Sequence, residues 1–228
     1  MDFPGLRSSL HTVEDRIRHH QGIGGWTHPV RIVAVTKTHG SEAVRAAFAA
    51  GLLDIGENRV QEALAKQDQL TDLPVRWHLI GTLQRNKARH AVGRFALIHS
   101  VDRNELAEEL ARRVAPGGRQ AVLVEVNCSG ESQKGGVEPA GLPALLERIS
   151  GLPSLELRGL MTMAALTADV TAQRTAFGRL RAERDRMTAA GYPLPELSMG
   201  MSGDYPIAVE EGATMVRLGT LLFGERTP

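Results

Sequence analysis

Residues 31–40 read Arg31-Ile32-Val33-Ala34-Val35-Thr36-Lys37-Thr38-His39-Gly40. The first six are apolar and rich in β-branched side chains, which is typical of a buried parallel strand. Ligands of parallel α/β folds bind at the carboxyl ends of the strands, which is where Lys37 stands. A lysine there can be half-desolvated, so that its pKa falls and its neutral amine can attack an aldehyde. Position alone favours the plainer interpretation, a surface lysine in a strand-to-helix turn.

On both sides of this stretch, segments with strand and helix character alternate. An opening helix is expected at about residues 5–21, ended by glycines at positions 22, 24 and 25, and its buried face should carry Leu6, Leu10, Val13 and Ile17. Each expected strand is followed by a helix or its remnant. The strands are expected at residues 31–36, 53–56, 77–81, 96–100, 121–126, 155–161, 196–199 and 214–219.

Eight such units predict an α/β fold, a single (β/α)8 TIM barrel with an extra N-terminal helix. The competing architecture is a doubly wound open sheet, which usually has fewer strands and often a glycine-rich fingerprint after the first one. No such fingerprint follows Val35, and no linker or low-complexity stretch divides the chain. We therefore expect one domain over residues 1–228.

Composition narrows the class of protein. The chain has 228 residues, is 42% hydrophobic, and carries 27 basic and 26 acidic residues for a net charge of +1. This balance argues against a protein built mainly to bind nucleic acid. No signal-peptide pattern opens the chain, and no apolar run approaches the ~20 residues that span a bilayer. The single cysteine, Cys128, excludes an intramolecular disulfide framework and fits a reducing cytoplasm, where we expect the protein to be located.

The loops after the seventh and eighth strands indicate a phosphate site. Barrels commonly bind phosphate there, and these loops contain Ser202, Gly203, Gly219 and Thr220, which offer hydroxyls and closely approachable backbone amides. Arg217 alternates with apolar neighbours on the eighth strand and should point into the barrel. A buried guanidinium needs an acceptor, either a protein carboxylate such as Glu125 or a bound ligand.

A strand-end lysine and a phosphate site in one barrel suggest a phosphorylated aldehyde. Pyridoxal 5′-phosphate fits, but a sugar-phosphate aldolase or isomerase would use similar parts. Glu57 and Asn58 end the second strand and are expected to contact a ligand. No metal site is predicted, because the histidines lack metal-ligand spacing with a carboxylate or cysteine, and His78 is interpreted as a hydrogen-bonded core residue.

Six collinear motifs then resemble one family, the pyridoxal 5′-phosphate homeostasis proteins, also called proline synthetase co-transcribed homologues. The resemblance runs from about residue 30 to residue 224. The motifs are residues 34–37, 56–62, 77–87, 158–161, 197–202 and 214–220, closed by Phe223-Gly224.

The resemblance implies a fold-type-III barrel like the N-terminal domain of alanine racemase, with pyridoxal phosphate carried as a Schiff base on Lys37. It further implies that phosphate is contacted by Ser202, Gly219 and Thr220, that Arg217 lies near the pyridine ring, and that Asn58 and Ile80 line the cofactor. An arginine cannot accept the pyridine proton, so the ring would be a poor electron sink. In the fifth loop Lys134 matches a family lysine with altered neighbours, and is either a second cofactor-handling lysine or a solvated loop residue.

The resemblance therefore implies a non-catalytic binding protein for vitamin B6 homeostasis, with apo-enzymes that need pyridoxal phosphate as possible partners. It implies no nucleic-acid or membrane partner, and we expect a monomer. The alternative is a fold-type-III enzyme, an amino-acid racemase or decarboxylase. Such enzymes add a second domain that supplies a catalytic tyrosine or cysteine, and this sequence ends about nine residues after its last strand. An aldolase would instead need a lysine on a later strand.

Overall fold

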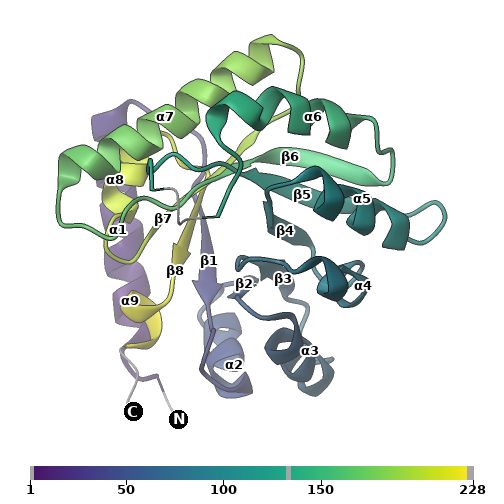
Figure 1. The fold of residues 1–228 in the computed structure, drawn as a ribbon. Helices are drawn as coiled ribbons and strands as arrows, with labels where there is room; N and C mark the ends of the chain where they lie inside the picture. The colour runs from purple at the N-terminus through teal and green to yellow at the C-terminus, as the bar shows by residue number, and fades with distance from the viewer. Residues whose placement is uncertain (1–2, 132–134, 225–228) are drawn as a thin grey trace.

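The eight expected strands close into a barrel. The computed structural model describes residues 3–131 and 135–224, and its strands are all parallel, each pairing with its neighbours in sequence order and the last pairing with the first (Figure 1). The (β/α)8 barrel predicted from the alternation of segments is confirmed. The strands are β1 (Arg31–Val35), β2 (Asp54–Glu57), β3 (Arg76–Leu79), β4 (Leu97–Val101), β5 (Gln120–Glu125), β6 (Leu155–Met161), β7 (Glu196–Met201) and β8 (Met215–Leu218).

Helices surround the barrel and connect its strands. Those after β3 and β8 are short. The α-helices are α1 (Leu6–Gly24), α2 (Ser41–Ala49), α3 (Val60–Gln69), α4 (Ala88–Ala91), α5 (Asn104–Arg113), α6 (Leu142–Ser150), α7 (Val170–Ala189), α8 (Tyr205–Glu210) and α9 (Thr220–Phe223), and the 3-10 turns are η1 (Arg85–Lys87) and η2 (Pro139–Gly141).

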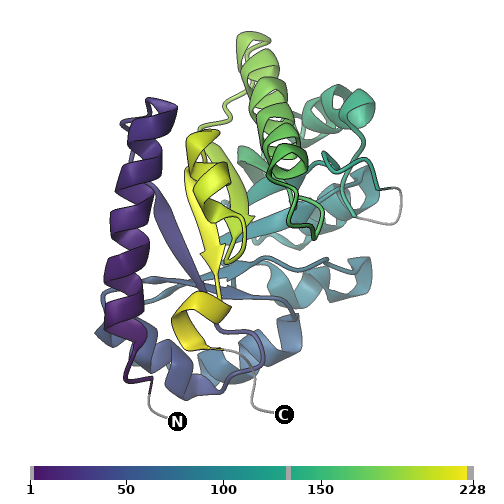
Figure 2. The same cartoon turned by 90° about the vertical axis from the view of Figure 1, so that its left-hand side faces the viewer.

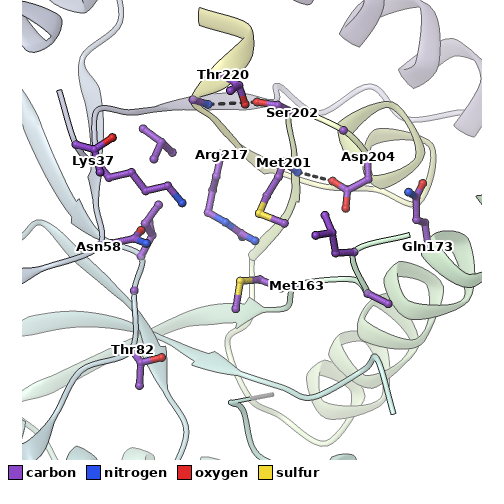
Figure 3. A pocket seen from close by; sticks show the side chains of 18 of the residues that line it. Lys37, Asn58, Thr82, Met163, Gln173, Met201, Ser202, Asp204, Arg217 and Thr220 are labelled. Atoms are coloured by element: carbon purple, nitrogen blue, oxygen red, sulfur yellow. Dashed lines mark hydrogen bonds between the residues drawn. The ribbon is translucent and has the colours of Figure 1, made fainter. Parts of the chain in front are cut away.

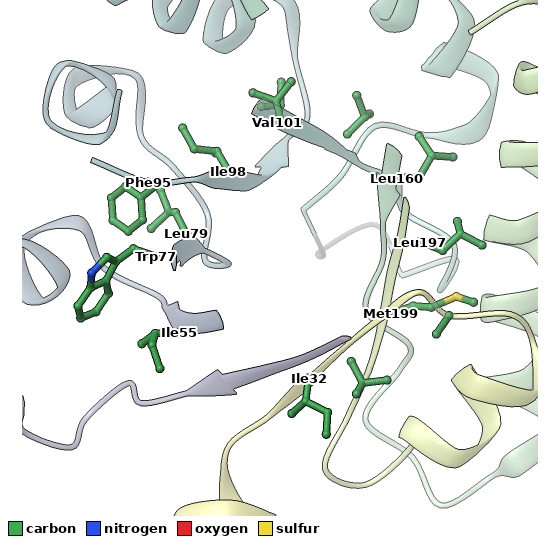
Figure 4. Packing of buried hydrophobic residues seen from close by; sticks show 14 of the residues in the cluster. Ile32, Ile55, Trp77, Leu79, Phe95, Ile98, Val101, Leu160, Leu197 and Met199 are labelled. Atoms are coloured by element: carbon green, nitrogen blue, oxygen red, sulfur yellow. The ribbon is translucent and has the colours of Figure 1, made fainter. Parts of the chain in front are cut away.

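The alternation of side chains along each strand produces two hydrophobic clusters. The larger lies between the strands and the helices, and Figure 4 shows strand residues such as Ile32, Leu79 and Ile98 within it. The smaller contains strand residues alone, among them Val33 and Leu123, and therefore fills the barrel interior. Alternate residues of one strand thus face the helices and the interior, and the interior residues nearest the carboxyl ends can reach a ligand.

Helix α1 packs along the outside of the barrel against α8 and α9 (Figure 2). Its buried residues are the four expected from their spacing, Leu6, Leu10, Val13 and Ile17. The predicted end of this helix is wrong, because the helix continues through Gly22 and Gly24. It ends where Gly25 adopts a left-handed backbone (φ 73°) and its N–H bonds to the carbonyls of Gln21 and Gly22.

Candidate functional site

A cavity of about 500 Å³ opens at the carboxyl ends of the strands. All seven residues that the sequence singled out for a cofactor line it, although they come from five different strands or the loops after them: Lys37, Asn58, Ile80, Ser202, Arg217, Gly219 and Thr220. Figure 3 shows Lys37 and Asn58 on the left side of the cavity, Arg217 in the middle, and Ser202 and Thr220 at the top. The volume lies within the roughly 300–1,000 Å³ range of small-molecule sites.

A buried ion pair fixes the end of the strand that leads to Lys37. Lys66 reaches from α3 to donate to a Glu57 carboxylate oxygen (2.5 Å) and to the Thr36 carbonyl (2.7 Å), and the Thr36 hydroxyl donates to the same carboxylate oxygen (2.6 Å). All three residues are at least 93% buried. The Glu57 carboxylate is therefore engaged by Lys66 and Thr36, and Glu57 is absent from the cavity lining. The expectation that it contacts a ligand is wrong.

Lys37 itself is an exposed residue of the cavity wall. The half-desolvated amine expected from its strand-end position is therefore not what the structure has. The amine makes no ion pair or hydrogen bond with any residue in the described ranges. A lysine amine that faces a cavity and is not engaged by the protein can form a covalent bond with a carbonyl ligand.

The turn after Lys37 is strained. Thr38 has φ 71°, and it is the single non-glycine residue of the described chain with a positive φ. Threonine is β-branched, and such residues rarely adopt this backbone because the side chain clashes with it. Strain of this kind persists where the surroundings impose it, and it is concentrated at functional sites. Here it lies directly beside the lysine of the cavity.

On one side of the cavity, hydrogen-bond donors from two loops come together. The Ser202 hydroxyl oxygen receives long hydrogen bonds (3.4 Å each) from the backbone N–H groups of Gly219 and Leu221, the latter in α9. Thr220, between them, adds an exposed hydroxyl to the lining. Two amides and two hydroxyls converging on one region are the donor set that a phosphate group needs. The residues present therefore fit a phosphorylated ligand.

Arg217 is buried at the floor of the cavity, as its alternation along β8 predicted. One of its terminal nitrogens donates to the carbonyl (2.8 Å) and hydroxyl (2.7 Å) of Ser198, and the other donates to the Thr162 carbonyl (2.9 Å). Burial lowers the pKa of Arg217 to about 10, and the nearby carboxylates of Asp204 and Glu125 oppose that change. The suggested pair with Glu125 does not form, since the guanidinium is held by two carbonyls and a hydroxyl.

Glu125 ends β5 and also lines the cavity, with 3% of its surface exposed. Its carboxyl oxygens have no hydrogen-bond partner within residues 3–131 and 135–224. Burial raises the pKa of Glu125 to about 7; the negative charge of Asp102 adds to this increase, and Arg217 opposes it. The cavity floor therefore carries an acid that exchanges its proton near neutral pH.

Asn58 and Ile80 complete the wall next to Lys37, and a close backbone approach holds them there. A Cβ on Gly81 would lie 2.4 Å from the Asn58 carbonyl oxygen, so only glycine lets the loop after β3 pass this closely. Gly81 is itself part of the lining.

Sequence reasoning missed the loop between β6 and α7. It contributes Met163, Ala165, Leu166 and Thr167 to the lining, and Gln173 follows from α7, where its side-chain amide donates to the Thr167 carbonyl (2.7 Å). No motif marks this loop. Its position after a barrel strand was the available signal.

Several other predictions concern residues away from the cavity. His78 is a hydrogen-bonded core histidine, as interpreted. Cys128 is buried, and burial raises the pKa of its thiol to about 11. In the described ranges no cluster of histidine, cysteine and acidic side chains could hold a metal ion, and no helix is long and apolar enough to span a membrane. Lys134 lies outside the described residues.

Comparison with known proteins follows the same direction. Residues 9–227 match the family model for the alanine racemase N-terminal domain. The pyridoxal phosphate homeostasis protein of Pseudomonas aeruginosa is 46% identical over 224 residues, covering 97% of this chain and 96% of that protein. The protein of the same name from Aquifex aeolicus is 46% identical over 198 residues, covering 86% and 87%.

Two solved structures have folds similar to this one, at high and at low sequence identity. PipY of Synechococcus elongatus, solved with PLP bound, superposes with a TM-score of 0.84 at 40% identity, covering 96% of this chain and all of that one. Alanine racemase of Clostridium difficile superposes with a TM-score of 0.73 at 16% identity over 94% of this chain and 58% of that one, which shows a common fold. The chain belongs to the pyridoxal phosphate homeostasis protein family and has the barrel fold of the alanine racemase N-terminal domain.

Proposed function

We propose that this protein binds pyridoxal 5′-phosphate as a Schiff base on Lys37 and serves as a carrier in vitamin B6 homeostasis, without amino-acid turnover of its own. The observation that carries the proposal is one cavity that unites a lysine amine with no protein partner, a phosphate-type donor set and a buried arginine. When bound, the cofactor supplies an aldehyde for an amine and a phosphate for anchoring. The PLP-bound PipY structure and the names of the relatives support it.

The sequence contains few lysines, which narrows the choice of the amine that would bind the aldehyde. The sequence has four: Lys37, Lys66, Lys87 and Lys134. Lys66 is buried in its pair with Glu57, and Lys87 is absent from the cavity lining. Lys37 is therefore the cavity lysine of the described chain, and Ser202, Gly219 and Thr220 would hold the phosphate while Asn58, Ile80 and Arg217 contact the ring.

The chemistry of the lining favours carrying over catalysis. Removing a proton from an amino acid's Cα and returning it on the other face needs a base on each face. Apart from Lys37, the titratable side chains of the described lining are His39, Glu125 and Asp204. The His39 ring packs against Phe3 and Phe223, and Asp204 accepts from the Met201 amide, which leaves Glu125 as the one candidate for a second base in the described lining. Arg217, which cannot accept the pyridine proton, would also weaken the ring as an electron sink.

Borohydride trapping tests the binding. Purified protein incubated with pyridoxal phosphate should gain the visible absorbance band of an aldehyde–amine adduct, and borohydride reduction should attach the cofactor to the Lys37 peptide. The Lys87→Ala variant should behave as wild type. A colourless protein, or an adduct on the Lys134 peptide, would contradict the assignment.

Deuterium exchange separates a carrier from an enzyme. Incubating the loaded protein with each amino acid in deuterated water should give no enzyme-like deuterium incorporation at Cα. Incorporation that disappears in Lys37→Ala would make the protein a fold-type-III enzyme instead.

The proposal also includes apo-enzymes as recipients of the cofactor, a monomeric state and a cytoplasmic location. The single buried cysteine agrees with that location.

A further inference from the structure

A row of polar side chains crosses the inside of the barrel. Asp54, His78, His99, Ser198 and Arg217 come from β2, β3, β4, β7 and β8, and each is at least 95% buried. Branched apolar residues usually fill this space in such barrels. Buried polar groups are costly unless they are fully hydrogen-bonded, so an interior row of this kind needs an explanation.

The five residues form an unbroken chain of hydrogen bonds. Asp54 Oδ1 lies 2.9 Å from His78 Nε2, and His78 Nδ1 lies 2.9 Å from His99 Nε2. His99 Nδ1 lies 3.0 Å from the Ser198 hydroxyl, which lies 2.7 Å from a terminal nitrogen of Arg217. The chain begins at the amino ends of the strands and ends at the floor of the cavity.

Proton positions in this chain follow from its two ends. Arg217 can only donate to the Ser198 hydroxyl oxygen, which leaves the Ser198 O–H available to donate a hydrogen bond to His99 Nδ1. Burial above all, with the positive charges of Arg217 and Arg31 adding to it, lowers the pKa of His99 well below its ordinary value. His99 is therefore neutral, and its one proton sits on Nε2 and is donated to His78 Nδ1.

The other end agrees with this direction. His78 accepts at Nδ1 and so carries its proton on Nε2, from which it donates to Asp54. Burial would raise the pKa of Asp54, but hydrogen bonds from Arg76 and His78 outweigh it and hold that pKa well below its usual range. Asp54 is thus an ionised acceptor, and each donor from Ser198 to His78 has an acceptor.

We propose that His78, His99 and Ser198 are positioning residues for Arg217: a one-directional hydrogen-bond chain, ending on Asp54, that holds the guanidinium in one orientation at the cavity floor. Three of the five guanidinium N–H groups are used by Ser198 and Thr162. Two N–H groups, one of them on Nε, have no partner within the described residues. The chain leaves these two in a fixed position for a ligand. The inference rests on the proposed function only in taking that ligand to be pyridoxal phosphate.

Nuclear magnetic resonance of the cofactor-free, full-length protein tests the chain directly. Imidazole ¹⁵N and ¹H shifts should show that the rings of His78 and His99 each carry their proton on Nε2 and accept at Nδ1. Asp54→Asn should change the signals of His78 more than those of an exposed histidine such as His11. A proton on Nδ1 of either ring would overturn the proposal even if the protein binds pyridoxal phosphate.

Two substitutions of one histidine separate positioning from packing. In His99→Asn the amide oxygen can replace Nδ1 as the acceptor for Ser198, whereas in His99→Gln the amide nitrogen can replace Nε2 as the donor to His78. Only His99→Gln leaves the Ser198 hydroxyl without its acceptor. Spectrophotometric titration with pyridoxal phosphate should show a Kd near wild type for His99→Asn, and about tenfold weaker binding for His99→Gln and Ser198→Ala.

Leu123→Ala is the control, because Leu123 is a fully buried interior residue outside the cavity lining. It should lower the melting temperature without a comparable change in Kd. Equal weakening in both His99 variants and in Leu123→Ala would show that the row only fills the barrel. If wild type fails to bind the cofactor, the proposed function fails. The proton positions on His78 and His99 would still show whether the hydrogen-bond chain runs in the proposed direction.

Discussion

The two ends of the barrel carry the same kinds of charged side chains but use them differently. At the amino ends, the charges are the first residues of their strands and are paired: Arg76 with Asp54 at 2.6 Å and Arg31 with Glu196 at 2.6 Å. At the carboxyl ends, Lys37 and Glu125 have no ion-pair or hydrogen-bond partner for their charged atoms in the described chain. The amino end satisfies these charges internally and contributes stability, whereas the carboxyl end, apart from its buried Glu57–Lys66 pair, keeps two charged groups available for a ligand.

The largest expected effect is at the open end. Lys37→Ala should abolish the covalently retained cofactor completely, because it removes the amine that the proposal assigns to the bond. The melting temperature of the cofactor-free variant should stay near that of wild type, since the side chain is exposed. Mass spectrometry after borohydride reduction measures the first result and a thermal melt the second. A large melting loss would instead make Lys37 a structural residue.

The paired end should show the opposite behaviour. Asp54→Asn should lower the free energy of unfolding by about 3 kcal/mol at pH 7, because a buried carboxylate loses its charged bonds to Arg76 and His78. Urea denaturation of the cofactor-free protein measures it. The folded-state pKa of Asp54 is depressed, so its contribution is present above the ordinary carboxyl range and is lost as the pH falls below it. A difference that persists unchanged at low pH would contradict this.

Glu125 allows a test of the open end that depends on pH. Its folded-state pKa of about 7 is raised above the ordinary 4.5, so the protonated carboxyl stabilises the fold at low pH, and that stability is lost as the pH rises through about 7. Glu125→Gln should therefore be more stable than wild type at pH 8 by about 3 kcal/mol, since the pKa rises from 4.5 to about 7 and one pKa unit is worth about 1.4 kcal/mol. At pH 4 the gain should vanish. Equal gains at both values would assign the effect to packing.

The smallest expected effect concerns the strained turn. Thr38→Gly should relieve the left-handed backbone and, against the entropy of glycine, change stability by at most about 1 kcal/mol. Borohydride trapping on Lys37 should become slower, because the turn no longer holds the lysine in one direction. Thr71→Gly, in an exposed turn outside the cavity lining, is a control for the loss of a threonine side chain. Unchanged trapping in Thr38→Gly would show that the strain does not position Lys37.

Much of the site was predictable because barrel topology turns sequence order into spatial order. Once eight strands are assigned, Lys37, Asn58, Ser202 and Arg217 must meet at the same end. The direction of Arg217 followed from the period-two alternation of strand side chains. Glu57 was misassigned because the same alternation sends it away from the cavity, and its partner Lys66 lies on a helix whose reach back to the strand no local pattern reveals.

Local sequence thus determined the barrel, the buried face of α1 and the set of residues around the cavity, because strand and helix periodicities are properties of neighbouring residues. Tertiary structure alone decided which polar groups are satisfied. Asp54, His78, His99 and Ser198 are far apart in sequence, and their chain exists only because four strands bring their interior side chains within hydrogen-bond distance. The protonation of Glu125 and the orientation of Arg217 depend on burial and on such long-range contacts, which closure of the barrel creates.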